Sequence, residues 1–474
     1  MAPVSTDPPR SPPRSWRSTV VYLLMLLATV GGFLAIREVG EKLVAPEAKT
    51  PAFGTGHANL RFDVLMHILL ALALVILTAR LLGALFARLR QPPVIGEVLA
   101  GILLGPSLLG RVAPEVSAFV LPQSVAPFLS ILAQVGVILY MFLVGLELDF
   151  ARLRQRTHVT VAISHASIVA PFLMGAALAL LLYPRVSSRD VPFTYFALFS
   201  GVAMSVTAFP VLARILTDRK LQGTRMGAIA LTCAAVDDVT AWCLLALVVS
   251  VVNSRVGGGF LTIASTLAFL GVMLLLARPV ARLVRRYEDG GGQLDKNVLS
   301  VMFVVMLICA LTTELIGIHA VFGAFALGAI IPAGSKLAGE LRHRLEDFIV
   351  VLLLPAFFAY TGLRTQVGLL SGASEWLLCA LVLVTACAGK FGGTYVAARL
   401  TGLGWQDSAS LGVLMNTRGL MELIVLNIGL DLRVISPVLF AMLVIMAIVT
   451  TVATTPLLHF IESLTHPPPR EATS

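Results

Sequence analysis

The sequence predicts an all-α polytopic membrane protein. Three observations lead to this fold class. Of the 474 residues, 57% are apolar and only 13% are charged, whereas soluble globular chains carry about 25% charged residues. A mean hydropathy of +0.91 over this length cannot be covered by polar surface, so the bilayer has to be the solvent for most of the chain. The apolar residues also gather in runs of roughly 20, the length of a membrane-spanning helix.

The chain begins with residues 1–18, which are rich in Pro, Ser and Arg and are expected to be a disordered cytoplasmic N-terminus. The next run, 19–36, predicts an extra transmembrane helix. Arg14 and Arg17 precede it as in a signal peptide, but no small-x-small cleavage site follows, so we expect it to be retained. A short cytoplasmic tail, 459–474, ends the chain.

Between these ends, further apolar runs bring the expected total to about fourteen helices. They lie at 62–85, 93–110, 126–148, 157–183, 193–216, 223–252, 259–283, 297–316, 319–333, 346–363, 374–398, 406–430 and 434–458.

The loops between these runs orient the chain. If the N-terminus is cytoplasmic, the loops on that side hold about twice as many Lys and Arg as the opposite loops, as the positive-inside rule requires. We therefore expect both termini on the cytoplasmic side of the inner membrane. The net charge of +9 belongs to these loops and does not indicate a nucleic-acid partner. Because zinc, haem, Walker and Gly-x-Ser-x-Gly motifs are missing from the sequence, we expect no cofactor and no enzyme.

The number of helices permits two repeats of opposite orientation within a transmembrane domain of 62–458. Repeat one covers about 62–252, a linker helix about 259–283, and repeat two about 297–458. Inverted repeats are the architecture of secondary transporters, which bind substrate near the midplane. Ordinary packing of small residues is the alternative explanation of the similarity between the halves.

Two short sequence similarities support the repeat. Residues 95–101 resemble 322–328, and residues 201–205 resemble 412–416. Each pair falls at equivalent places in the two halves, which is stronger evidence than either similarity alone.

The helices at 193–216 and 406–430 also carry residues that interrupt a helix. Thr207 and Pro210 lie within the first, and Asn416 and Arg418 lie at matching depth in the second. Irregular backbone at membrane depth has to line a cavity or be buried in protein. We expect two broken helices that cross at the centre, with Arg418 neutralising converging helix ends.

Two adjacent carboxylates, Asp237 and Asp238, lie near the middle of the helix at 223–252. Each costs about 2.5–3.5 kcal/mol to insert, so the pair needs a proton, a cation or a charged partner. Adjacent helical residues point about 100° apart, so one carboxylate can face a wet cavity and the other a neighbouring helix. Their hard oxygens suit a small monovalent metal cation and equally a proton. A purely structural ion pair is the alternative.

Lys390 lies among glycines in the helix at 374–398 and is the candidate charge partner of Asp237. A lysine that extends to the membrane surface is the alternative. Glu147, Glu314 and His319 are possible pathway residues.

Five stretches of the sequence have the pattern of a known family, namely 91–106, 142–149, 201–214, 318–325 and 416–429. In these stretches the chain resembles the cation:proton antiporter-2 family. Within that family it looks most like the plant-type cation/proton exchangers and their bacterial relatives.

The resemblance implies a sodium/proton antiporter-like fold, and a homodimer with a static interface domain and a mobile six-helix core. It implies that Asp238 binds the ion. Asp237 matches a position that is Asp in electrogenic members and Asn in electroneutral and plant-type members, and Lys390 matches the lysine that pairs with it. The Asp-Asp pair departs from the Asn-Asp of the plant-type members, so the stoichiometry stays open. The chain also lacks their long cytoplasmic regulatory region, so we expect no nucleotide or glutathione control.

These observations favour exchange of Na⁺ or K⁺ for H⁺ by alternating access, with the proton gradient driving cation export. A potassium-channel-like efflux protein and a sodium-coupled organic-anion symporter on the same fold are the alternatives. The residues do not distinguish sodium from potassium.

Overall fold

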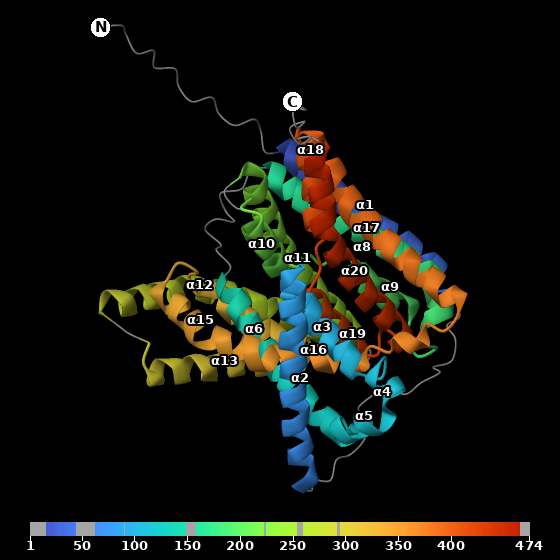
Figure 1. Ribbon diagram of the computed structural model, residues 1–474. Helices are drawn as coiled ribbons and strands as arrows, with labels where there is room; N and C mark the ends of the chain where they lie inside the picture. Colours follow the sequence, from blue (N-terminus) through green and yellow to red (C-terminus); the bar gives the residue numbers. More distant parts are fainter. Residues whose placement is uncertain are drawn as a thin grey trace, which may run out of the picture.

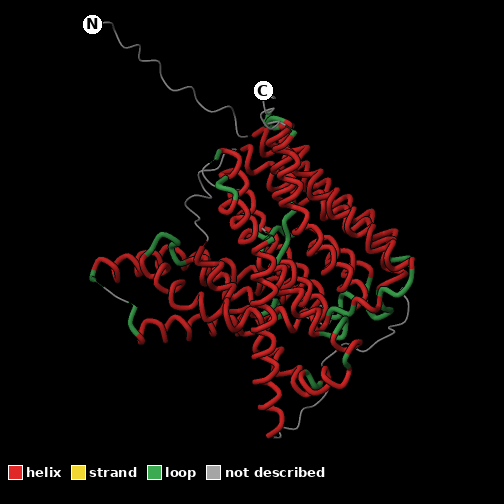
Figure 2. The backbone as a smooth tube through the Cα atoms, in the orientation of Figure 1, coloured by secondary structure: helices red, strands yellow, loops and turns green. Residues whose placement is uncertain are grey.

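The computed structural model describes most of the chain. The described residues are 16–43, 62–89, 91–147, 158–221, 224–253, 259–291 and 294–464. Within them the secondary structure is entirely helical, without a β-strand (Figure 2). Residues 1–15 and 465–474, which make up most of the two expected terminal segments, lie outside this description.

The helices follow the order of the apolar runs (Figure 1). They are α1 (Trp16–Gly40), α2 (Phe62–Arg88), α3 (Pro93–Leu104), α4 (Leu109–Val112), α5 (Pro114–Val120), η1 (Gln123–Val125), α6 (Ala126–Glu147), α8 (His158–Val186), α9 (Phe193–Ser205), α10 (Phe209–Asp218), α11 (Arg225–Asn253), α12 (Gly259–Asp289), α13 (Lys296–Ile316), α14 (Ala320–Ile330), α15 (Lys336–Phe348), η3 (Ile349–Leu353), α16 (Leu354–Arg364), η4 (Val367–Leu369), α17 (Ala373–Leu400), α18 (Trp405–Met415), α19 (Leu420–Asp431) and α20 (Pro437–Ser463).

The described residues contain 12 helices that are long and apolar enough to cross a membrane, or 13 if the bent pair α18 and α19 counts as one span. The expectation of about fourteen was too high because the run at 319–333 forms only the 11-residue α14. Eleven residues cover about 17 Å, well short of the ~30 Å hydrocarbon layer. Gly317, in the left-handed conformation with φ 91°, ends α13, and α14 ends before the extended Ile331.

The transmembrane helices pack into two groups. The first, which we call the scaffold group, consists of α2, α3, α6, α13, α14 and α16. The second, which we call the core group, consists of α8, α9, α10, α11, α17, α18, α19 and α20, and α1 packs on its outside against α8 and α9. The linker α12 contacts helices of both groups. Figure 1 shows α12, α13 and α15 on one side of the molecule and α1, α8 and α17 on the other.

Glycines allow the closest crossings inside the scaffold group. A Cβ added to Gly101 in α3 would lie 2.3 Å from the carbonyl oxygen of Phe358 in α16. The equivalent glycine of the sequence repeat, Gly328 in α14, would place a Cβ 2.3 Å from the carbonyl oxygen of Phe142 in α6. The second helix of each half therefore contacts the third helix of the other half through the same kind of glycine.

The core group has a matching pair of contacts. A Cβ on Gly201 in α9 would meet the ring and the carbonyl oxygen of Phe172 in α8, both at 2.9 Å. A Cβ on Gly412 in α18 would meet Phe391 of α17 in the same way, at 2.8 Å from the ring and 3.1 Å from the oxygen. Two repeats related by a pseudo-twofold axis would produce such equivalent contacts, and the boundaries of the repeats stay a prediction.

Candidate functional site

Two interrupted helices meet in the middle of the core group. The backbone is not helical at 206–208, between α9 and α10, or at 416–419, between α18 and α19. Figure 2 shows loop segments within the helical bundle at this place. The Ala208 N–H donates to the carbonyl oxygen of Thr417 at 3.0 Å, and the Thr207 hydroxyl lies 3.3 Å from that of Met415. The two unwound segments are therefore hydrogen-bonded to each other, as expected for broken helices that cross.

Pro210 lies just after the first break. It occupies the first turn of α10, where its missing N–H costs no helical hydrogen bond. The interruption therefore precedes the proline, at Val206–Ala208, and the proline helps to fix where the second half-helix begins.

Arg418 binds the C-terminal end of α9, the first half of the broken helix. Its side chain is fully buried and donates to the carbonyl oxygens of Ala203 at 2.8 Å and Met204 at 2.7 Å. These carbonyls belong to the last turn of α9 and have no partner within the helix. The guanidinium also forms an ion pair of 2.7 Å with Glu422, which lies in the first turn of α19. Arg418 is thus placed to compensate the negative end of α9.

Asn416 lies at the second break and is less fully bonded. Its amide nitrogen contacts the sulfur of Cys387 at 3.4 Å. Among the described residues, its side-chain oxygen has no hydrogen-bond donor.

Asp237 is saturated with hydrogen bonds although it is completely buried. Its Oδ1 accepts from Ser164 at 2.6 Å. Its Oδ2 accepts from Thr207 at 3.0 Å, from Lys390 at 3.1 Å and, by a short contact, from Ser167. The serines come from α8, the threonine from the first helix break and the lysine from α17. Asp237 therefore ties together three helices and the unwound segment.

Lys390 does not extend to the membrane surface, because its side chain is 0% exposed. Besides Asp237, its ammonium group donates to the carbonyl oxygen of Ser205, the last residue of α9, at 2.5 Å. A Cβ on the neighbouring Gly389 would lie 2.7 Å from the Cα of Pro171. The glycine therefore lets α17 approach α8 closely enough for this lysine to reach the carboxylate.

Asp238 has a different environment from its neighbour. It is 2% exposed, and the backbone N–H of Phe209, at the start of α10, interacts with its carboxylate. Its Oδ1 is buried, and nothing in the described part of the chain donates a hydrogen bond to it. A buried carboxylate oxygen without a donor is costly unless a proton or a cation satisfies it. This atom is the best candidate for a group that binds and releases an ion.

The three possible pathway residues do not form one site, although Glu314 and His319 lie close to each other. Glu147, at the end of α6, forms an ion pair of 2.9 Å with Arg342. Glu314 accepts from the N–H of Ala320 at 2.7 Å, and His319 lines a cavity together with Gln134 from the first half of α6. Along α6, Glu147 and Gln134 are separated by about 20 Å of helix. Glu147 therefore lies far from the cavity that contains His319.

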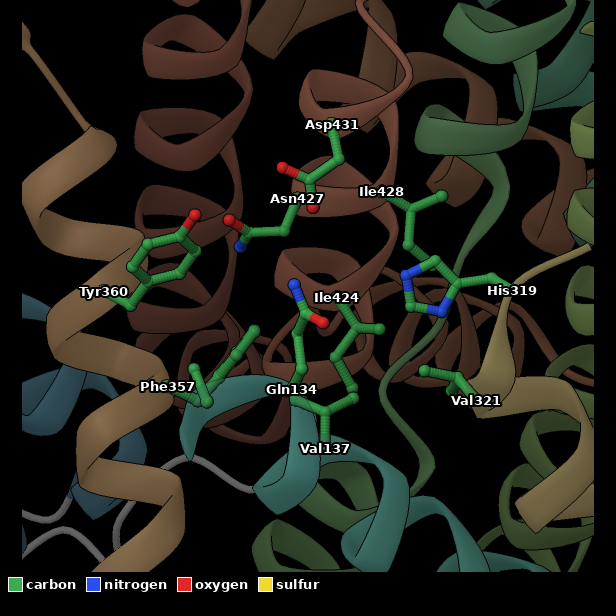
Figure 3. Close-up of a pocket in the computed structure, with 11 residues that line it drawn as sticks. Gln134, Val137, His319, Val321, Phe357, Tyr360, Ile424, Asn427, Ile428 and Asp431 are labelled. Carbon is green, nitrogen blue, oxygen red and sulfur yellow. The ribbon is translucent and has the colours of Figure 1, made fainter. Parts of the chain in front are cut away.

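The cavity beside His319 lies between the two helix groups (Figure 3). Figure 3 shows the side chains of Gln134, Asn427 and Asp431 turned toward its interior, with Tyr360 and His319 on opposite sides. This cavity, whose wall combines a few polar side chains with apolar ones such as Val137 and Ile424, was not expected from the sequence, which offers no pattern that joins α6, α16 and α19.

The sequence matches the family model described as sodium/hydrogen exchanger, transmembrane, over residues 73–461. The sodium/proton antiporter NhaS4 of Synechocystis is 47% identical over 397 residues, which cover 83% of this chain and 97% of that protein. Cation/proton antiporter 20 of Arabidopsis thaliana is 40% identical, covering 85% of this chain and 49% of that protein. The potassium/proton antiporter 1 of Saccharomyces cerevisiae is 33% identical, covering 82% and 45%.

The chain thus spans nearly all of the cyanobacterial relative and about half of the plant and yeast relatives. Among solved structures, the sodium proton antiporter MjNhaP1 from Methanocaldococcus jannaschii matches with a TM-score of 0.60 over 85% of this chain and 97% of that one. At 14% identity this likeness establishes the fold alone.

Proposed function

Since the chain belongs to the sodium/hydrogen exchanger family, a family of transporters and not of enzymes, we propose that it exchanges a monovalent cation, Na⁺ or K⁺, for protons. The observation that carries the proposal is the contrast between the two central carboxylates. Asp237 has a donor for each oxygen, whereas Asp238 keeps a buried oxygen without one in the described part of the chain.

Competition at Asp238 supplies the coupling. A desolvated carboxylate is costly unless it is neutralised, so the site is occupied either by a proton or by a metal cation. Carboxylate, hydroxyl and backbone oxygens suit a hard monovalent cation, and the start of α10 beside the carboxylate helps to hold it when it is charged. Because the two ligands exclude each other, carrying the site across the membrane with one and back with the other gives exchange.

The two helix groups suggest how the site moves. Both broken helices, α11 and α17 belong to the core group, so the whole ion site can shift as one body against the scaffold group. We propose that the scaffold group forms a homodimer interface and stays still. We further propose that both termini face the cytoplasm at the inner membrane and that the proton gradient drives cation export.

Proteoliposomes that carry a pH-sensitive dye test this function. Addition of Na⁺, K⁺ or Li⁺ in turn should dissipate an imposed pH gradient, and Asp238→Asn should abolish the response. Asp407→Asn, at an exposed position at the start of α18, is the matched control and should respond like the unaltered protein.

Two results would reject parts of the proposal. Continued exchange in Asp238→Asn would remove this residue from the ion site. Cation uptake that never affects the pH gradient would indicate a channel in place of an exchanger.

A further inference from the structure

A cluster of polar side chains joins the scaffold group to the core group at one end of the bundle. Arg364 is the last residue of α16, in the scaffold group, and Asp431 is the last residue of α19, in the core group. Their side chains form an ion pair of 2.6 Å. Arg364 also donates to the side-chain oxygen of Asn427 at 3.1 Å. The same guanidinium therefore contacts two successive turns of α19.

A second bridge lies one turn deeper. The amide nitrogen of Asn427 donates to the hydroxyl of Thr361 in α16 at 2.8 Å. Thr361 and Arg364 are three residues apart, and Asn427 and Asp431 are four apart, so each pair lies on one face of its helix. The two helices are thus connected by consecutive side-chain contacts along facing surfaces.

These contacts cross the boundary between the groups. The helix α16 packs mainly on α3 and α6, whereas α19 packs on α20 and α9. The cavity of Figure 3 lies at the same boundary, and its lining includes Asn427 and Asp431 together with Gln134 of the scaffold group. Any sliding of the core group against the scaffold group has to break or lengthen these contacts.

The burial of the cluster suits a contact that forms and breaks. The Arg364 side chain is only 5% exposed, but that of Asp431 is 39% exposed. Water can therefore reach the carboxylate and replace the guanidinium when the two separate. By contrast, Arg418 and Glu422 are both 0% exposed and both belong to the core group, so their ion pair does not have to break when the groups move. The guanidinium of Arg364 also lies 5.0 Å from the ring centre of Tyr360, which holds it in place on α16.

We propose that Arg364, Asp431, Asn427 and Thr361 form a latch that holds the two groups together and closes the route to Asp238 from this end of the bundle. The latch rests on the proposed exchange function and adds a gate to it. It opens once in each transport cycle, when the ion site becomes accessible from this side.

Cysteine accessibility tests the latch without measuring transport. The five native cysteines are replaced by serine, and Val137→Cys places a reporter in the cavity wall on α6. A membrane-impermeant thiol reagent is added from the side on which α16 ends. Arg364→Gln and Asp431→Asn should each raise the labelling rate about tenfold, the size typical of a coupling between two conformations. The double variant should label no faster than Arg364→Gln alone, because that single variant already removes both the ion pair with Asp431 and the guanidinium contact with Asn427.

Controls separate a gate from general loosening. Asp407→Asn should leave labelling unchanged, and a second reporter, Val382→Cys, buried at 0% exposure in α17, should stay unlabelled in every variant. The charge-exchanged variant Arg364→Glu with Asp431→Lys should restore slow labelling. Unchanged labelling of the cavity in Arg364→Gln would overturn the latch, as would labelling of the α17 reporter to the same extent.

A cross-link tests whether the latch has to open during the transport cycle. Thr361→Cys with Asn427→Cys, joined by a short bifunctional thiol reagent that a reductant cleaves, should stop exchange reversibly. Full exchange by the cross-linked protein would overturn the latch. The labelling result does not require that any ion is exchanged, so a failure of the antiport proposal and a failure of the latch are distinguishable.

Discussion

Replacement of Arg418 by glutamine tests the reasoning on the second broken helix most directly. The guanidinium has three partners, which are the carbonyl oxygens of Ala203 and Met204 and the carboxylate of Glu422. All of its side chain is buried. The substitution leaves a buried carboxylate without its counter-charge and two helix-end carbonyls without their charged donor.

The expected cost follows from these contacts. Breaking a buried ion pair from one side costs about 3–5 kcal/mol, and the two unpaired carbonyls add to it. Replacement of Glu422 by glutamine should cost less, about 1–3 kcal/mol. The glutamine oxygen still accepts from Arg418, which also keeps both carbonyls of α9. From the midpoints of the two ranges, the arginine variant is expected to lose about twice as much free energy of unfolding as the glutamate variant.

Reversible unfolding by titration with SDS from a mild detergent, followed by circular dichroism, measures the free energy of unfolding of both variants. Arg282→Gln, at an exposed position of α12, is the control and should stay within about 0.5 kcal/mol of the unaltered protein. Equal losses for Arg418→Gln and Glu422→Gln would show that the ion pair alone matters. The inference that Arg418 compensates the negative end of α9 would then be wrong.

Two further predictions use the same titration. Gly101→Ala should lower the free energy of unfolding by about 1–3 kcal/mol, because its Cβ would lie 2.3 Å from the carbonyl oxygen of Phe358. Gly271→Ala, which has nothing within 4 Å of the added Cβ, should raise it by up to about 1 kcal/mol. Equal effects of the two substitutions would contradict the close crossing of α3 and α16. Asp237→Asn should lower the free energy of unfolding by about 3 kcal/mol, because it leaves Lys390 buried without a counter-charge. Adding Lys390→Met to this variant should recover most of that loss. No recovery would show that the carboxylate stabilises the fold mainly through its hydroxyl donors.

Charge and backbone arguments explain which parts of the site could be predicted from the sequence. A carboxylate inside the membrane needs a partner, and Lys390 is an intramembrane cation at suitable depth, so cost made it a candidate partner of Asp237 and the family resemblance favoured the pairing that the structure has across 153 positions. The same argument places Arg418 at the end of a broken helix. Apolar runs likewise predict most spans, because the thickness of the bilayer sets one length for all of them.

The neutral donors could not be predicted in this way. Ser164 and Ser167 bind Asp237, and Thr451 both donates to the carbonyl oxygen of Arg418 at 2.7 Å and accepts from its N–H at 3.2 Å. Hydroxyl groups in helices usually bond to a carbonyl one turn earlier, and the Thr451 oxygen also lies 2.7 Å from the carbonyl oxygen of Ala447, so the sequence does not show which hydroxyls turn toward another helix. Their roles depend on how the helices rotate about their axes, which tertiary packing decides.

The latch could not be predicted from the sequence for a related reason. Arg364 and Asp431 both lie at helix ends, where charged residues commonly face water. Their pairing is set by the relative position of α16 and α19. The sequence contains no periodic signal for a contact between two helix ends that are 67 residues apart.

The unequal surroundings of the two central carboxylates also bear on the charge moved per cycle. With Lys390 held 3.1 Å from Asp237, the two charges cancel, and the site presents only the charge of Asp238. One monovalent cation or one proton neutralises that charge, so a pair that stays intact gives exchange of one for one. Electrogenic exchange requires that Lys390 release Asp237, so that a second proton takes part in each cycle. A membrane-potential clamp by ionophore in the proteoliposome assay distinguishes the two cases, and the charge per cycle therefore reports whether this contact persists while the core group moves.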